Sequence, residues 1–252
     1  MFNMGLLKQE SFICLDLETT GLDPQSDRII EAAAAKFSLE EIFDAFESLI
    51  DPLCPIPKES IDIHHITEEM VRGKPKIEEI LPQLISFIGN DVIVGHGIPF
   101  DVAFLIAACK QHGIPHHLNK NLQIDTLRLA RLYGGSPTNS LEMLRTHFNI
   151  KPEGAHRAMS DVMITIEVFK QLSKPFKTAK EILDRLKKPI LLKKMPLGKH
   201  KGRLFSEIPL EYLKWASHQD FDQDLMYSLK TELSKRKKGD RFQQAASPFS
   251  SL

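Results

Sequence analysis

The chain has 252 residues, of which 42% are hydrophobic and 26% charged, so a sizeable core can form and a disordered protein is excluded. The formal net charge is zero, but residues 1–173 contain 15 Lys and Arg against 24 Asp and Glu, while residues 174–252 contain 18 against 9. This asymmetry predicts an acidic site in the front part of the chain and an anion-binding surface in the back part.

Targeting signals and cysteine spacing bear on where the protein acts. No run of about 18 uninterrupted apolar residues is present, so the sequence predicts no membrane span. The start, MFNMGLLKQESF, lacks the long apolar segment of a signal peptide. The three cysteines, Cys14, Cys54 and Cys109, form no C-x-x-C pair and no zinc spacing, which is typical of a reducing compartment. A cytoplasmic protein without a membrane partner is expected.

Apolar periodicity gives the expected elements in chain order. Three strand-like runs separated by short turns come first, at residues 12–17, 29–37 and 42–50. They are followed by a helix at 77–88, a short strand at 92–94, a helix at 100–109, a strand at 122–125 and helices at 126–133, 140–148 and 157–172. Three strands followed by alternating helices and strands predict an α/β fold with a mixed sheet.

The segment ICLDLETTGL, residues 13–22, ends an apolar strand with two carboxylates. Side chains two positions apart on a strand point to the same face, so Asp16 and Glu18 should lie together. Two adjacent carboxylates repel unless a cation lies between them, and oxygen ligands suit Mg²⁺ or Mn²⁺ better than zinc. A lone D-x-E is more often a solvated strand end, so a metal site requires partners elsewhere in the chain.

Two further segments supply such partners. GHGIPFD, residues 95–101, places Asp101 at the start of a helix directly after a short strand, where open α/β sheets collect ligands. HRAMSD, residues 156–161, places His156 before a helix and Asp161 in its first turns. Each acid alone is more often a cap or a dipole partner. Four acids and a histidine, all beside apolar elements that lead to one sheet edge, favour a metal-dependent site.

The segments DLETTGL, HGIPFD and HRAMSD, in this order and spacing, resemble the three motifs of the DEDDh (DnaQ-like) 3′-to-5′ exonuclease superfamily. That superfamily includes the proofreading epsilon subunit of bacterial replicative polymerases. The resemblance covers roughly residues 8–173. It implies an RNase H-like fold, a mixed five-stranded sheet flanked by helices, with three antiparallel strands first.

The resemblance also implies roles for individual residues. Asp16, Glu18, Asp101 and Asp161 would hold two Mg²⁺ or Mn²⁺ ions, and His156 would be the general base. Two ions can activate a water, stabilise the leaving oxygen and neutralise charge at phosphorus, and the reference pKa of histidine, about 6.5, suits a base near neutrality. The residues that would bind the terminal nucleotide are Thr19, Thr20, Gly21, Leu22, His96 and Phe100.

The chain departs from the family pattern at one position. Where the family commonly has H-N-A-x-F-D, Gly97 replaces the asparagine. The replacement leaves the metal-binding acids in place but removes an amide that could contact the substrate. The neighbouring His96 is equally consistent with a substrate contact and with a packed structural histidine.

The back part of the chain has a different character. We expect a basic linker at 174–194, a small module at 195–241 and a disordered tail at 242–252. The module's start, MPLGKHKGRLF, resembles a small uncharacterised bacterial domain with an MPFGKYKG-type start, and this resemblance implies no activity. Its basic residues could hold a phosphate backbone. Tyr212 and Trp215 are expected in a core rather than on a base-stacking surface.

These features together predict a metal-dependent 3′-to-5′ exonuclease that releases nucleoside monophosphates from single-stranded or frayed 3′ ends of DNA, in proofreading or repair. RNA trimming stays open, because discrimination rests on contacts to the 2′ position, and so does association with a DNA polymerase. A non-catalytic binding protein is less favoured, because all four acids and His156 are present. A metal phosphatase is disfavoured, because the sequence has neither a nucleophile motif nor a His-rich metal set.

Overall fold

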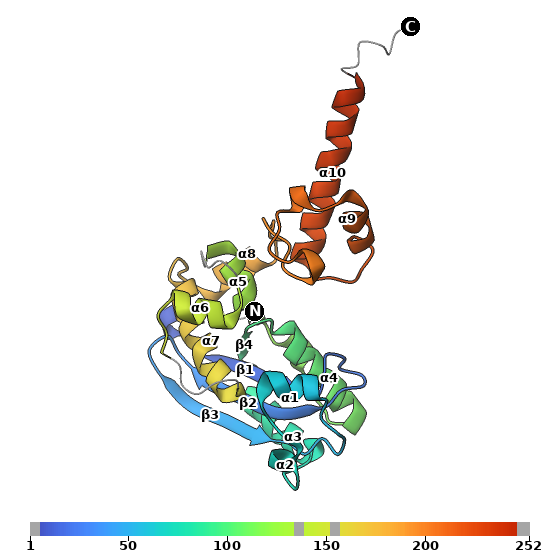
Figure 1. Cartoon of the computed structure of the whole chain (residues 1–252). Coiled ribbons are helices and arrows are strands. Elements are labelled where there is room, and N and C mark those ends of the chain that lie inside the picture. Colours follow the sequence, from blue (N-terminus) through green and yellow to red (C-terminus); the bar gives the residue numbers. More distant parts are fainter. Residues whose placement is uncertain (1–5, 134–138, 152–156, 246–252) are drawn as a thin grey trace. The chain divides into compact units, whose positions relative to one another are not determined.

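The structure is a computed structural model that describes residues 6–133, 139–151 and 157–245 (Figure 1). The chain divides into two compact units, Met1–Leu186 and Lys187–Leu252, which are described separately below. Within the described residues, no helix combines the length and the apolar character that crossing a membrane requires.

The first unit is built around a five-stranded sheet with the order β3-β2-β1-β4-β5. The strands are β1 Phe12–Thr19, β2 Ile29–Phe37, β3 Ile42–Leu49, β4 Val92–Gly95 and β5 Gln123–Asp125. The first three are antiparallel neighbours, whereas β4 runs parallel to β1 and β5 parallel to β4. This arrangement confirms the predicted mixed five-stranded sheet, and it brings the carboxyl ends of β1, β4 and β5 to one edge.

Helices cover both faces of this sheet. The helices are α1 Lys58–His64, α2 Glu68–Val71, α3 Ile77–Ile88, α4 Pro99–His112, α5 Thr126–Tyr133, α6 Leu141–His147, α7 Ala158–Ser173 and α8 Ala179–Leu186, with short 3₁₀ turns η1 Leu7–Gln9 and η2 Leu118–Lys120. The strands and the longer helices lie within a few residues of their predicted positions. The short helices α1 and α2 were not predicted, because neither contains a full period of apolar residues.

The side-chain alternation of β1 sorts its residues between two cores. Phe12 and Cys14 pack in a cluster that includes Phe169 of α7, whereas Ile13 and Leu15 pack in a cluster built with α3 and α4. The side chains of all four of these strand residues are buried. Because alternate residues share a face, the side chains at positions 16 and 18 continue the row that faces α7.

The first unit extends further along the chain than the sequence suggested. Residues 174–194 were expected to be a linker, but this segment contains α8, whose Ala179, Ile182 and Leu186 are buried in the same cluster as Phe169. These three positions repeat at helical spacing and form one apolar face. The compact unit therefore ends after α8 rather than before it.

The second unit has its own small core. Its elements are η3 Gly198–His200, η4 Phe205–Glu207, α9 Leu210–Ala216 and α10 Gln223–Ala245. The core residues are Met195, Phe205, Ile208, Leu213, Ala216, Leu225 and Leu229. The buried Asp224 accepts a hydrogen bond from the Ile190 amide (2.9 Å), which ties the start of the unit to α10. The tail expected at 242–252 begins inside α10, and its residues 246–252 lie outside the described residues.

Candidate active site

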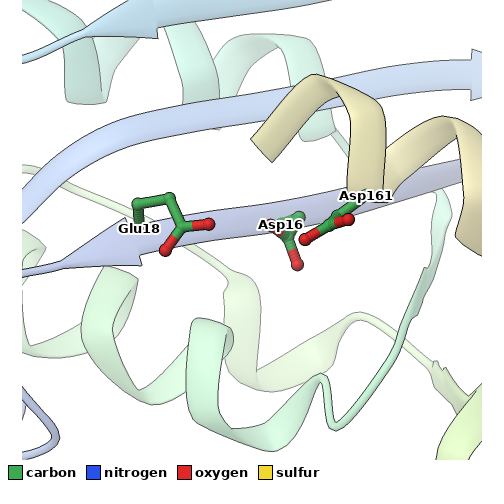
Figure 2. A group of neighbouring side chains, drawn as sticks. All are labelled: Asp16, Glu18 and Asp161. Carbon is green, nitrogen blue, oxygen red and sulfur yellow. The ribbon is translucent and has the colours of Figure 1, made fainter. Parts of the chain in front are cut away.

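Three carboxylates meet where β1 faces the start of α7. Asp16 and Glu18 lie on β1, and Asp161 lies in the first turn of α7. One oxygen of each carboxylate lies within 4.8 Å of the corresponding oxygens of the other two. Figure 2 shows the side chains of Glu18 and Asp161 pointing from opposite sides toward Asp16. The structure thus brings together three of the four acids that the sequence singled out.

The fourth acid, Asp101, reaches the same strand from the helix on the other side of the sheet. It lies in the first turn of α4 and is 5% exposed. Its Oδ1 accepts a hydrogen bond from the Leu17 amide (3.0 Å). The parallel strand β4 pairs with β1 only as far as Cys14. Beyond that point the Asp101 carboxylate takes the place of a β4 carbonyl and accepts the hydrogen bond of the Leu17 amide. Leu17 lies between Asp16 and Glu18 in the strand, so Asp101 approaches the strand next to both acids.

His156, the expected general base, lies outside the described residues. The next residue, Arg157, is described and precedes α7 as its cap residue. Its guanidinium forms an ion pair with Glu31 of β2, in which Nε donates to both carboxylate oxygens (2.9 and 3.1 Å) and Nη2 makes a further short contact. Glu31 also accepts a hydrogen bond from the Ala158 amide (3.0 Å), the first helical N–H of α7.

The Glu31–Arg157 pair was not predicted from the sequence. Glu31 is fully buried, and in the register of the sheet it lies directly opposite Glu18. The available signal was a single acid in the run IIEAAAAKF, whose other residues are apolar except Lys36. A carboxylate buried in such a strand requires a partner. The pair anchors the beginning of α7 to the sheet and thereby fixes the position of Asp161.

Burial and the charges of neighbouring acids raise the pKa values of Asp16, Glu18 and Asp101. Burial is the main cause for Glu18, whose pKa rises to about 8 with added repulsion from Asp161. Burial also raises the pKa of Asp101 to about 7, although its hydrogen bond from Leu17 opposes the shift. The pKa of Asp16 lies well above its ordinary value because of burial and then the charges of Asp101 and Asp161. Clustered acids of this kind are poised to accept positive charge.

The donor set fits a hard divalent cation. The three clustered groups offer only carboxylate oxygens, which are preferred by Mg²⁺ and Mn²⁺. The raised pKa values of Asp16 and Glu18 mean that the protein alone does not compensate the charge of their ionised forms. The Arg157 guanidinium lowers the pKa of Glu18, but burial and the neighbouring acids outweigh this effect, and Arg157 is already paired with Glu31.

The turn after β1 holds the residues expected to contact a nucleotide. Thr20 is buried, and its hydroxyl donates to Asp27 (3.3 Å) while accepting from the Arg28 amide (2.9 Å). The Thr19 hydroxyl donates to the Gly21 carbonyl (2.6 Å). Leu22 is 84% exposed. The two threonine hydroxyls therefore shape the turn, while the turn presents the Leu22 side chain to solvent.

The segment around Gly97 is organised by a buried acid of β5. Asp125 accepts hydrogen bonds from the amides of Gly97 (2.9 Å) and Leu127 (2.9 Å). Gly97 has φ of +81°, a conformation that favours glycine, and a Cβ there would meet nothing within 4 Å. His96 lies within hydrogen-bond distance of the Thr126 hydroxyl (Nδ1···Oγ1 3.0 Å), and burial lowers its pKa to about 4. Phe100 packs on Phe104 with ring centroids 4.8 Å apart.

Residues 13–169, more than half of the chain, match the family model described as "Exonuclease" (RNase_T). The DNA polymerase III subunit epsilon of Aquifex aeolicus is 34% identical over 160 residues, which cover 63% of this chain and 78% of that protein. The PolC-type DNA polymerase III of Clostridium perfringens is 36% identical over 176 residues, which cover 69% of this chain. The chain spans only 12% of the length of that polymerase.

Solved structures with the same fold include exonuclease I and exonuclease X. An exonuclease I structure superposes with a TM-score of 0.60 at 23% identity, over 71% of this chain and 43% of that chain. Exonuclease X in complex with 5′ overhanging duplex DNA superposes with a TM-score of 0.54 at 29% identity, over 69% of this chain and 98% of that chain.

The sheet order and the carboxylate cluster, together with these matches, define an exonuclease of RNase H-like fold. The chain belongs to the DEDDh-type (DnaQ-like) 3′-to-5′ exonuclease family, as its three sequence motifs indicated. Residues 183–233 separately match a family model described as "Putative quorum-sensing-regulated virulence factor". That second match covers all of α9 and the first part of α10, and it assigns no chemistry to them.

Proposed function

We propose that this chain hydrolyses DNA from single-stranded or frayed 3′ ends and releases nucleoside monophosphates with the help of two Mg²⁺ or Mn²⁺ ions. The observation that carries the proposal is the convergence of Asp16, Glu18 and Asp161 within 4.8 Å, with Asp101 bonded to the same strand. In an exonuclease family member, this oxygen-rich cluster is the natural place for the ions.

In this proposal the four acids hold the ions at the end of β1. Bound divalent ions supply charge neutralisation at the phosphate and activation of the attacking water. Asp16 contributes from the middle of the cluster, Glu18 and Asp161 from either side, and Asp101 from the start of α4. The rigid sheet and the anchored start of α7 hold the carboxylates in place before the substrate arrives, which lowers the reorganisation needed for reaction.

We assign the proton-accepting role to His156, on the basis of the family motif HRAMSD. A histidine accepts a proton efficiently near neutral pH because its pKa lies close to the working pH. His156→Ala should lower kcat by about 10² to 10⁴ while the protein stays folded. A loss smaller than tenfold would assign the base role to another group.

The exposed Leu22 and the turn around Gly21 are proposed to contact the terminal nucleotide, with Leu22 against the base. His96 and Phe100, at the neighbouring start of α4, complete this proposed substrate surface. Thr19 and Thr20 contribute through their backbone, since their hydroxyls are already engaged inside the turn.

DNA is the proposed substrate because the relatives are DNA polymerase III proteins and because the structural neighbours include complexes with single-stranded and duplex DNA. The relatives are DNA polymerase III proteins, which makes a DNA polymerase a candidate partner. We propose a role in proofreading or repair in the cytoplasm. RNA trimming is the alternative that the assay below decides.

The test uses 5′-labelled single-stranded DNA and RNA of the same sequence, incubated with the full chain in Mg²⁺, Mn²⁺ or EDTA. We expect a ladder that shortens from the 3′ end with either metal, stops in EDTA and is absent in Asp16→Ala/Glu18→Ala. If RNA is shortened faster than DNA, RNA rather than DNA is the substrate. Absence of shortening on both substrates, with the variant and the wild type equally folded, would overturn the proposal.

A further inference from the structure

A tight loop between Met195 and Arg203 in the second unit is closed by backbone hydrogen bonds and carries exposed basic side chains. The amide of Met195 donates to the Arg203 carbonyl (2.9 Å), and the Gly202 amide donates to the Met195 carbonyl (2.8 Å). Gly198 and Gly202 have positive φ values, +69° and +83°, which allow the chain to turn back within this length. The residues between them, including the exposed Lys199 and Lys201, are therefore presented on a closed and ordered loop.

An aromatic group adjoins this loop. Tyr212 and Trp215 lie three positions apart on α9, with ring centroids separated by 5.2 Å. The ammonium of Lys199 lies 5.5 Å from the centroid of the Tyr212 ring, and His200 meets the same ring edge-on at 4.4 Å. Gly198 approaches Tyr212 so closely that a Cβ at this position would lie 2.9 Å from the tyrosine oxygen. The loop and the aromatic pair thus form one continuous surface.

The exposure of Trp215 distinguishes it from an ordinary core residue. Tyr212 packs against the core of the second unit, as expected, whereas Trp215 is 53% exposed and the expectation that it lies in a core is wrong. The physical reason is that Leu213 and Ala216 already supply the buried face of α9. The Trp215 ring packs on Tyr212 but keeps about half of its surface exposed, and this exposed part is available to a partner.

The two loop lysines are also available. Among the described residues of the second unit, carboxylates pair with Lys214 and Arg236, and none lies within ion-pair distance of Lys199 or Lys201. Residues 187–252 contain 14 Lys and Arg against 7 Asp and Glu, a net charge of +7. Unpaired cations on a basic unit favour a polyanionic partner over a protein surface of mixed charge.

We propose that Lys199, Lys201 and Trp215 form a binding site for a single-stranded polynucleotide, with phosphates on the two lysines and a base stacked on the tryptophan. Exposed aromatic rings beside backbone-binding cations are the general means by which proteins hold single strands without reading their sequence. The inference stands on the second unit alone and goes beyond the proposed hydrolysis. Only the expectation that this binding would assist digestion of the strand rests on the proposed exonuclease function.

The chain offers a direct probe, because Trp215 is its only tryptophan. The experiment titrates the full chain with oligo-dT and, separately, oligo-U in EDTA, with tryptophan fluorescence as the readout. We expect saturable quenching, since a base that stacks on the indole changes its emission. EDTA prevents metal-dependent hydrolysis, so a failure of the proposed exonuclease activity would leave this result intact.

Two variants test the named groups. Lys199→Ala/Lys201→Ala keeps the tryptophan and should weaken binding, with a salt dependence shallower by about 1.4 in the slope of log K against log salt, about 0.7 for each phosphate contact. Trp215→Ala should weaken binding by about 5- to 150-fold, as measured by the anisotropy of a labelled oligonucleotide. The matched controls are Lys230→Ala/Lys235→Ala and Tyr227→Ala on α10, which remove the same charge and an exposed aromatic ring elsewhere in the unit.

Absence of quenching by both oligonucleotides would overturn the proposal, as would equal losses in the loop variant and the charge-matched control. Quenching with an unchanged affinity for Trp215→Ala would also overturn the stacking role. Thermal unfolding of each variant separates these outcomes from misfolding. A preference for oligo-dT or for oligo-U identifies which nucleic acid the site takes.

Discussion

Glu31 and Arg157, 126 positions apart in the chain, form an ion pair that joins β2 to the start of α7. The carboxylate is fully buried, and it also accepts the first amide of the helix. The pair therefore links the strand opposite Glu18 to the helix that carries Asp161, and both of those acids belong to the proposed metal site.

Arg157→Ala should destabilise the protein by about 3 kcal/mol, because it leaves the Glu31 carboxylate buried without its cation. It should also lower the exonuclease rate, since the start of α7 loses its anchor. Urea unfolding followed by the activity assay measures both effects. Lys58→Ala is the matched control, because its ion pair with Asp62 is exposed (81% and 61%) and should contribute under 1 kcal/mol. Equal losses of stability in the two variants would contradict this role.

The raised pKa values of the site predict that the metal-free protein loses stability as the pH rises. Burial raises the pKa of Glu18 to about 8, so the folded protein holds a proton that the unfolded chain releases at lower pH. Between about pH 6.5 and pH 8.5 this group alone should cost about 2 kcal/mol of unfolding free energy. Burial lowers the pKa of folded His96 to about 4, so this residue is neutral in the folded protein throughout the range. In the unfolded chain it still titrates near pH 6.5, which adds an opposing change of only about 0.4 kcal/mol.

Thermal unfolding in EDTA across this range measures the effect. Glu18→Gln should show a flatter pH dependence, because the titrating group is gone. Excess Mg²⁺ or Mn²⁺ at the higher pH should raise the Tm of the wild type, since an ion that binds only the folded state stabilises it. A Tm that rises with pH in EDTA would contradict this prediction. A Tm that neither Mg²⁺ nor Mn²⁺ changes would show that the cluster does not bind these ions.

Gly21→Ala should destabilise the turn that follows β1. A Cβ at this position would lie 2.6 Å from Asp27 Oδ1, and the same carboxylate accepts hydrogen bonds from the Asp23 amide (2.9 Å) and the Thr20 hydroxyl (3.3 Å). Moving the carboxylate breaks these contacts, at a cost of about 1–2 kcal/mol. A double-mutant cycle with Asp27→Ala should be non-additive, because removal of the carboxylate removes the clash. Additive losses would point to another cause.

Leu22→Ala should weaken substrate binding without affecting stability. The side chain is 84% exposed, so its loss should change the free energy of unfolding by no more than about 0.5 kcal/mol. If it contacts the terminal base equally in the ground and transition states, KM should rise about fivefold with kcat unchanged. Phe43→Ala, another exposed apolar residue but on the edge strand β3, should leave KM unchanged. Equal KM values for Leu22→Ala and the wild type would remove Leu22 from the substrate surface.

Sequence patterns predicted what depends on local periodicity. The two-residue period of a strand placed Asp16 and Glu18 on one face, and the structure has them on the face that meets α7. The order of strands and helices predicted the mixed sheet. The apolar periodicity likewise placed Asp101 and Asp161 in the first turns of two predicted helices, as observed.

Contacts between distant segments could not be predicted in the same way. Nothing local to IIEAAAAKF or HRAMSD indicates that Glu31 meets Arg157, because the pairing depends on the register of β2 against β1 and on the position of α7. The apolar face of α8 was visible in the sequence, but its place in the first core depends on the packing of the whole sheet. The exposure of Trp215 likewise depends on which other α9 residues fill the core.

The hydrogen bond from the Leu17 amide to Asp101 gives the protein an internal reporter of its own assembly. This N–H lies beyond the end of β4, so its protection depends on a side chain 84 positions away rather than on a neighbouring strand. Its hydrogen-exchange rate therefore measures how often the start of α4 separates from β1. A ligand that holds the start of α4 against β1 should slow the exchange of the Leu17 amide more than that of other amides of the sheet.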